Sequence, residues 1–340
     1  MRRIFIHEFL SGGGHAGDAA ETADLLPQGR AMRDALLADL LRVPDLTVTC
    51  AVSPHAGLSI SHPHPHPRLA AASAHVGETA LAFVQRQAAL HDLAWVIAPE
   101  SDGLLSALQS AVGAPRWVGC DADSIRVASS KRATLQALAV CGVTTPLNFN
   151  TDAATAGTRW IVKPDDGAGA LATRVHVRHT DALADFSQRQ AAGQSATFEP
   201  FVDGEALSVS LLAAPGFVQP VAFNRQQIAI DAAGHLHFDG VHTNAIDMHR
   251  DARAIRLHTL ALDVKRALPG LRGFVGIDLV WHAERGPVVI EVNPRVTSAY
   301  VGLSAALGRN LAEEILLLHG LPETRPETQP VITERADATA

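Results

Sequence analysis

The chain has 340 residues, of which 47% are hydrophobic and 19% charged, and its formal net charge is −7. The composition is that of a folded protein rather than a disordered one, and the length suggests two or three domains. The negative charge disfavours broad nucleic-acid binding, which needs surplus Lys and Arg, but it leaves room for a basic pocket that binds one triphosphate.

In the first third of the chain, short apolar runs alternate with helical stretches, which predicts a doubly wound α/β domain. The expected elements are strands at 3–7, 47–52 and 93–98, and helices at 29–41, at 78–90 and after the turn at 99–103.

Residues 62–67 read His-Pro-His-Pro-His-Pro between the second strand and its helix. Alternating prolines exclude a helix and remove backbone donors, so this segment is expected to be an exposed loop. We prefer a tolerated low-complexity insertion to the alternative, a metal-binding group of imidazoles.

From residue 121 the pattern changes to one long helix, a strand-like stretch and then mostly strands. The helices are expected at 123–140, 181–191, 250–268 and 310–319, and the strands at 142–146, 160–163, 174–178, 197–201, 206–213, 217–230, 274–282 and 288–292. Residues 321–340 are rich in Pro, Glu and Thr, which predicts a flexible tail.

Cysteines and apolar segments indicate the compartment. Cys50, Cys120 and Cys141 are far apart and odd in number, without metal-ligand spacing or a disulfide framework, which favours a reducing compartment. The apolar run near the N-terminus is too short for a secretory signal, and no segment approaches the roughly 20 apolar residues that span a bilayer. We expect a cytoplasmic protein.

Residues 161–170 place a lysine at the end of a predicted strand, before a loop of small residues. Glycine lets backbone N–H groups approach phosphate oxygens closely, and a lysine adds a positive charge. The segment is not a Walker A loop, which needs Gly-Lys-Ser/Thr at a helix start. A hairpin turn with an exposed lysine is the alternative. The residues concerned are Lys163, Asp166, Gly167, Ala168, Gly169 and Ala170.

Residues 199–205 connect two apolar strands and read Glu-Pro-Phe-Val-Asp-Gly-Glu. Such a linker can offer backbone groups to the edge of a planar base while an apolar residue packs on its face. Glu199 could accept a hydrogen bond from an exocyclic amine, and Glu205 could hold ribose hydroxyls. Taken alone, these residues are better explained by a solvated acidic turn.

The strongest feature is a predicted antiparallel hairpin over residues 276–295. Asp278 and Glu291 lie among apolar neighbours, and burying them is costly unless a cation or hydrogen bonds compensate. With the amide of Asn293 they form a set of hard oxygen ligands suited to Mg²⁺. Arg295 continues the same strand face and could neutralise charge on a transferring phosphoryl group.

Together these features resemble the ATP-grasp superfamily over residues 121–318. The residues that carry the resemblance are Lys131 in Ser-Ser-Lys, Lys163 and its glycine-rich loop, the linker 199–205, Asp278, and Glu-Val-Asn-Pro-Arg at 291–295. The resemblance implies an α/β protein in which a Rossmann-like (pre-ATP-grasp) domain at 1–120 precedes a two-lobed α+β ATP-grasp domain. Its small lobe would cover 121–196 and its large lobe 197–320.

The resemblance also implies an activity, the ATP-dependent joining of a carboxylate to an amine through an acylphosphate. Asp278, Glu291 and Asn293 would hold one or two Mg²⁺ ions, or Mn²⁺, and Lys163 and Arg295 would be catalytic. The ATP-binding residues would be Lys131, Lys163, Asp166, Gly167, Ala168, Gly169, Ala170, Glu199, Phe201, Val202 and Glu205.

Residues 4–14, 98–104 and 223–228 are similar to tyramine–glutamate ligases of methanofuran and methylofuran biosynthesis. Such enzymes join the γ-carboxylate of glutamate to tyramine. Pyrrolysine-type and dipeptide-like ligases share parts of these motifs and stay open, and residues 238–242 depart from the glycine-rich pattern of the group. The implied partners are small-molecule substrates, without nucleic acid or membrane, and a homodimer is compatible.

Five residues are candidates for substrate binding. Gly12, Gly13 and Gly14 could let a substrate carboxylate approach a helix N-terminus, or could simply form a tight turn. Glu100 could bind a substrate ammonium or cap its helix. Arg225 could pair with a substrate carboxylate or be an exposed strand residue.

Two other functions stay open. A nucleotide-binding sensor without turnover would not need the full metal set, so that set argues against it. A histidine-rich metal-handling protein depends on residues 62–66 alone.

Overall fold

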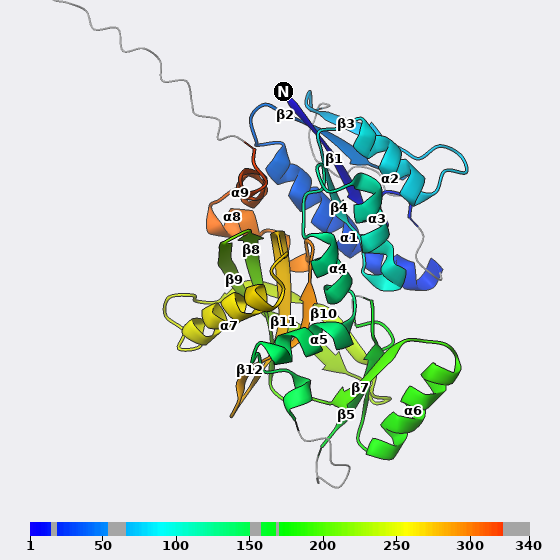
Figure 1. Cartoon of the computed structure of the whole chain (residues 1–340), viewed down its shortest axis with the longest axis vertical. Helices are drawn as coiled ribbons and strands as arrows, with labels where there is room; N and C mark the ends of the chain where they lie inside the picture. The colour runs from blue at the N-terminus through cyan, green and yellow to red at the C-terminus, as the bar shows by residue number, and fades with distance from the viewer. Residues whose placement is uncertain (15–18, 54–65, 150–157, 168–169, 322–340) are drawn as a thin grey trace, which may run out of the picture.

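The computed structural model describes residues 1–14, 19–53, 66–149, 158–167 and 170–321. The predicted lid residues Ala168 and Gly169, most of the His-Pro segment and the tail after residue 321 lie outside this range. Figure 1 shows a parallel sheet with its helices at one end of the molecule, a small sheet with α6 at the other, and a larger sheet between them.

The first unit is a four-stranded parallel sheet of order β3-β2-β1-β4, as the alternating pattern predicted. Ile4 and Ile6 share a buried cluster with Leu36 and Leu37 of α1, whereas Phe5 packs with Phe83 of α2 in another cluster. Helices therefore cover both faces. The elements are β1 (Arg2–Glu8), α1 (Ala19–Leu40), β2 (Leu46–Ala51), β3 (Leu69–Ala72), α2 (Ala80–Ala89), β4 (Leu93–Ile97), η1 (Ser101–Gly103) and α3 (Leu104–Val112).

A three-stranded antiparallel sheet of order β6-β5-β7 follows, with α6 packed on it. Trp160, Val162 and Ala182 form its small buried cluster. Two short helices precede it in the chain. The elements are α4 (Ala122–Ala128), α5 (Lys131–Val140), η2 (Pro146–Asn148), β5 (Trp160–Pro164), β6 (Arg174–His176), α6 (His179–Ala191) and β7 (Ala196–Pro200).

The third sheet has five antiparallel strands in the order β10-β9-β8-β11-β12. One face packs on α7, and Phe274 on the other face packs with Tyr300 and Leu311. The elements are β8 (Glu205–Ala214), β9 (Phe217–Ile230), β10 (Leu236–Ile246), α7 (Ala254–Ala267), β11 (Gly273–His282), β12 (Gly286–Asn293), η3 (Ser298–Tyr300), α8 (Leu303–Leu307) and α9 (Leu311–Leu318). No helix in the described part of the chain is long and apolar enough to cross a membrane.

The single helix predicted over 123–140 is wrong, because the chain breaks at Ser129 and Ser130 into α4 and α5. The Ser130 hydroxyl accepts from the backbone N–H of Ala133 at 3.1 Å and donates to Asp165 at 2.7 Å. The backbone N–H of Lys131 donates to the carbonyl of Asp165 at 2.8 Å. A tertiary contact with the segment after β5 therefore starts α5 at Lys131.

The strand predicted at 142–146 is also wrong. Residues 142–145 contain no strand, and Thr145 precedes the short helix η2, with its backbone N–H donating to Asn148 at 2.8 Å. β10 was not predicted because a register shift between Phe238 and Gly240 interrupts its apolar alternation. Strand β3 and helix α8 were likewise not predicted.

Candidate active site

One cavity of about 720 Å³ lies where the three sheets meet. Its wall includes Glu8 and Pro99 from the parallel sheet's end, β5 and β7 of the three-stranded sheet, and β8 to β12 of the larger one. The predicted site residues that line it are Lys131, Lys163, Asp166, Gly167, Ala170, Glu199, Phe201, Val202, Asp278, Glu291, Asn293 and Arg295.

Two lysines reach this cavity from different elements. Lys163 on β5 forms an ion pair with Glu199 on the neighbouring strand β7, and both side chains are only 5% exposed. Lys131, at the first position of α5, lies 3.5 Å from Glu291 and donates to the carbonyl of Gly167 at 3.2 Å. Because the helix breaks at Ser130, Lys131 is the first residue of a new helix, and its side chain lines the cavity. The predicted single helix over 123–140 did not show this.

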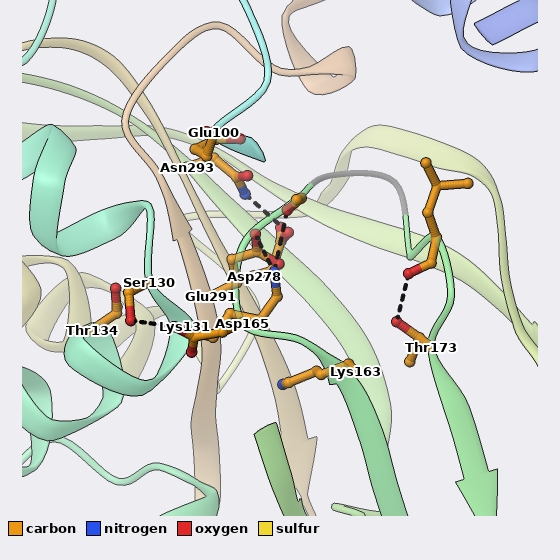
Figure 2. A network of polar contacts seen from close by, with 12 residues as sticks. Glu100, Ser130, Lys131, Thr134, Lys163, Asp165, Thr173, Asp278, Glu291 and Asn293 are labelled. Atoms are coloured by element: carbon orange, nitrogen blue, oxygen red, sulfur yellow. Dashed lines mark hydrogen bonds and ion pairs between the residues drawn. The ribbon is translucent and has the colours of Figure 1, made fainter. Parts of the chain in front are cut away.

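The predicted metal ligands are brought together by the pairing of β11 with β12. Asp278 and Glu291 are direct cross-strand partners, and a bulge follows Asp278. Asp278 accepts hydrogen bonds from the amides of Gln226 at 2.9 Å and Asn293 at 3.0 Å. Figure 2 shows Asp278, Glu291 and Asn293 close together, with Lys131 reaching them from the start of α5.

This donor set fits a hard divalent cation. Burial, and then the charge of Glu291, raises the pKa of Asp278 to about 7, so the pair carries negative charge that its protein neighbours do not fully compensate. The described residues contain no group of three or more His, Cys, Asp or Glu side chains that could hold a metal. An ion here would use two carboxylates and the Asn293 amide oxygen, and would complete its shell with phosphate oxygens and water.

Arg295 follows β12 and is held by a residue of the N-terminal unit. Its Nε and Nη2 donate to the two carboxylate oxygens of Glu100, each at 2.8 Å, and the side chains of Arg295 and Glu100 are 10% and 3% exposed. The sequence suggested that Glu100 binds a substrate ammonium or caps its helix, and the structure shows neither contact. Both its oxygens bind a protein partner, and it makes no side-chain cap hydrogen bond to the following helix.

Glu205 and Arg225 lie away from the cavity. Glu205 accepts from Arg225 at 2.7 Å and from Arg253 at 2.5 Å. Their chain neighbours Ala206 and Gln226 line the cavity, and consecutive strand residues point to opposite faces. The two side chains pair with each other and are not among the residues that line the cavity, so the binding roles predicted for them stay predictions.

The three glycines after β1 form a tight turn, which was the alternative to a substrate-binding role. The backbone N–H groups of Gly12 and Gly14 donate to the carbonyls of Glu8 and Phe9, each at 2.8 Å. A Cβ at Gly12 would lie 2.6 Å from the ring of His7, and one at Gly14 would lie 2.3 Å from the ring of Phe9. Glycine is needed here because neighbouring rings fill the space.

Several cavity residues were not singled out from the sequence. Arg159 pairs with Asp203 in the linker and lies 4.3 Å from the ring centroid of Phe201. Gln226 binds Asp278, and Glu8, almost fully buried, accepts from the backbone of Leu10 and Ser11. Asp203, Gln226 and Glu8 all fall inside the segments that carried the resemblance, which was the available signal.

The loop after β5 also contacts the N-terminal unit. The carboxylate of Asp166 accepts from the backbone N–H of Asp102 at 2.7 Å. Asp102 has a φ of 52°, in the left-handed region that few non-glycine residues adopt. Asp166, at the start of the predicted glycine-rich loop, is therefore held against the N-terminal unit.

Comparison with known proteins gives consistent family matches. Residues 128–299 match the ATP-grasp domain, and residues 46–125 match the pre ATP-grasp 3 domain. Two curated relatives, the tyramine–L-glutamate ligases of Methanocaldococcus jannaschii and Methanocaldococcus fervens, are each 28% identical over 214 residues. The match covers 62% of this chain, and 58% and 61% respectively of the lengths of these relatives.

Two solved structures have the same fold. The VanG D-Ala:D-Ser ligase of Enterococcus faecalis aligns with a TM-score of 0.65 at 13% identity, over 94% of this chain and 99% of that one. The D-alanine–D-alanine ligase of Bacillus anthracis aligns with a TM-score of 0.62 at 15% identity, over 94% and 97%. At these identities the similarity establishes the fold alone.

Proposed function

The chain belongs to the ATP-grasp family, and from this premise we propose that it is an ATP-dependent ligase that joins a carboxylate to an amine. The supporting observation is that two lysines, an arginine and two facing carboxylates from distant parts of the chain line one cavity. This is the set of charges that a triphosphate, a divalent cation and a reacting phosphoryl group require.

A carboxylate does not acylate an amine directly, because its oxygen is a poor leaving group. A carboxylate oxygen attacks the γ-phosphorus of ATP, the bond to the bridging oxygen of ADP breaks, and an acylphosphate forms. The amine nitrogen then attacks the acyl carbon, a C–N bond forms, phosphate leaves, and the nitrogen loses a proton. Such catalysis depends on positioning and on charge neutralisation, because water would otherwise hydrolyse the acylphosphate.

Each part of this chemistry has residues suited to it. Lys131 and Lys163 would bind phosphate oxygens, and Arg295 would neutralise the transferring phosphoryl group. Mg²⁺ bound to Asp278, Glu291 and Asn293 would screen the phosphate charge. The segment Phe201–Val202 would pack on the adenine, and Asp203, which lines the cavity where Glu205 does not, is the better candidate for the ribose.

For substrates we propose the γ-carboxylate of glutamate and the amine of tyramine. The names of the two curated relatives support this pair. Glu8, Gln28 and Asp102 of the N-terminal unit also line the cavity, and an acidic side chain there would pair with the ammonium group of an amino acid.

The test is ADP release from ATP and Mg²⁺ in the presence of L-glutamate, with and without tyramine, together with the product mass. Tyramine-dependent ADP and a product equal to the two substrates minus water would support the specific pair. ADP without tyramine dependence would keep the ligase chemistry and reject the amine. No ADP with any acid and amine would reject the ligase.

A further inference from the structure

Among the described residues, four cationic side chains line the cavity, and each is paired with a carboxylate. The pairs are Lys131 with Glu291, Arg159 with Asp203, Lys163 with Glu199, and Arg295 with Glu100. The carboxylates of the last three pairs lie outside the proposed metal ligands, whereas Glu291 is one of them. Within this set of four, Lys131 is therefore the cation that contacts a carboxylate proposed for Mg²⁺.

Two backbone elements fix the position of Lys131 at this carboxylate. The backbone N–H groups of Lys131 and Arg132 donate to the carbonyl and the carboxylate of Asp165, at 2.8 and 2.9 Å, which anchors the start of α5 beside the end of β5. α5 also packs against β12, the strand that carries Glu291. The ammonium group lies 3.5 Å from Glu291 and donates to the carbonyl of Gly167 at 3.2 Å. Figure 2 shows the lysine reaching the carboxylates from the start of α5.

The pair of Lys131 with Glu291 is largely shielded from solvent. The two side chains are 11% and 20% exposed. Asp278 faces Glu291 across the strands, and its oxygens accept hydrogen bonds from the amides of Gln226 and Asn293. Charges at such depth are weakly screened, so an ammonium group beside Glu291 would repel a second cation at the same carboxylate.

Either ligand of the proposed site would leave a charge without a partner if it bound alone. A divalent cation at Glu291 would repel or displace Lys131, which would then lose its carboxylate. A triphosphate that attracted Lys131 would leave the facing carboxylates of Glu291 and Asp278 without that cation. When both ligands bind, the divalent cation takes the carboxylates and the lysine takes the phosphate, so each charge keeps a partner.

We propose that Lys131 is an exchangeable counter-ion of Glu291, and that this exchange makes the site select the metal–nucleotide complex over the metal or the nucleotide alone. The inference rests on the proposed function, from which it takes the metal and phosphate roles. It gives Lys131 a second role, which is to pair with Glu291 until a divalent cation replaces it. Two ligands coupled in this way change each other's affinity by roughly 5- to 150-fold.

The experiment measures each ligand alone, because a divalent cation and ATP also bind each other. Mn²⁺ without nucleotide is titrated by the electron paramagnetic resonance signal of the free ion, and ATP is titrated by calorimetry in EDTA. Lys131→Met should bind Mn²⁺ about tenfold more tightly than the parent protein, because the competing ammonium group is gone. It should bind ATP more weakly, because the same group pairs with phosphate. A lysine with a phosphate role alone would change only the ATP affinity.

Three further variants locate the effect. Arg132→Met removes the same charge from an exposed position of the same helical turn, so its Mn²⁺ affinity should stay within about twofold of the parent value. Lys131→Arg keeps the charge and should bind Mn²⁺ like the parent protein. In Lys131→Met/Glu291→Gln the gain in Mn²⁺ affinity should disappear, which distinguishes this site from Mn²⁺ bound elsewhere on the chain.

Each contrary result identifies what has failed. Unchanged or weaker Mn²⁺ binding by folded Lys131→Met would overturn the inference without affecting the proposed ligase activity, as would a gain that persists in the double variant with Glu291→Gln. Lys131→Gln provides the same measurement if the methionine variant does not fold. If the parent protein binds no Mn²⁺ even with ATP, the metal assignment of the proposed function fails, and the inference fails with it.

Discussion

Glu100 and Arg295 are 195 residues apart in the chain, yet both oxygens of the carboxylate lie 2.8 Å from nitrogens of the guanidinium group. Their side chains are 3% and 10% exposed. Glu100 follows β4 of the parallel sheet, and Arg295 follows the strand that carries Glu291. The N-terminal unit thereby fixes the orientation of a cavity-lining arginine.

Replacing Glu100 should affect both stability and catalysis. Glu100→Gln leaves the mostly buried guanidinium of Arg295 with only the more distant carboxylates of Glu291 and Asp278, and breaking a buried pair costs about 3–5 kcal/mol. We expect a lower midpoint of urea unfolding, and a lower kcat for ADP formation with little change in the KM for ATP. The control is Asp92→Asn, which removes the exposed pair with Arg3 and should cost at most about 1 kcal/mol. Normal kcat in folded Glu100→Gln would contradict the positioning of Arg295.

The facing carboxylates should be needed for Mg²⁺ rather than for the fold. Asp278→Asn removes one of two facing, partly buried negative charges, so stability without metal should be unchanged or higher, whereas Glu291→Gln also gives up the ion pair with Lys131 and should change stability little. ADP formation should be lost across a full Mg²⁺ titration, and the rise in melting temperature with Mg²⁺ and ATP should disappear. A folded Glu291→Gln variant with full activity would refute the metal assignment.

Local patterns were sufficient for much of the fold. The strands around Lys163, Asp278 and Glu291 have strong apolar periodicity and clear turns, and the predicted antiparallel hairpin is confirmed. The break at Ser130 was not predictable, because it depends on Asp165, which is distant in sequence. β10 was missed because a bulge shifts its alternation.

The predicted site residues also fall into those that local sequence indicates and those that depend on distant partners. Residue type and spacing indicated which side chains gather in the cavity. Pairings such as Glu205 with Arg225 depend on which face of a strand each residue occupies, and on partners supplied by other elements. A charged residue in a motif therefore could not be assigned to a ligand until its protein partners were known.

Lys163 should contribute to ATP affinity. Lys163→Met removes a charge that would bind phosphate, and a hydrogen bond to a charged group is worth about 1.5–3 kcal/mol, so the Kd for ATP should rise about tenfold or more. The variant also leaves the buried carboxylate of Glu199 unpaired and should be destabilised. Titration calorimetry and urea unfolding measure the two effects.

The double variant Lys163→Met/Glu199→Gln separates these effects. It removes both charges, so it should regain stability relative to Lys163→Met while its ATP affinity stays low. If Lys163→Met binds ATP like the parent protein, the phosphate-binding role of this lysine is wrong.

His7 should make the fold sensitive to acid. Its ring is buried beside Phe5, Phe9 and Phe83, and neither ring nitrogen has a hydrogen-bond partner in the described part of the chain. Burial lowers the pKa of His7 to about 4 from the usual 6.5. Below pH 6.5 the unfolded chain binds a proton that the folded chain does not, so stability falls until the pH reaches the folded pKa.

The size and the origin of this acid sensitivity are both measurable. The difference between the two pKa values corresponds to about 3 kcal/mol, which is fully present above pH 6.5 and lost as the pH falls toward 4. His7→Leu cannot titrate, so its free energy of unfolding should decrease less between pH 7.5 and pH 4.5 than that of the parent protein. His319, whose pKa is also lowered by burial, is present in both proteins and cancels in the comparison. Parallel pH curves for the two proteins would show that His7 is not buried in its neutral form.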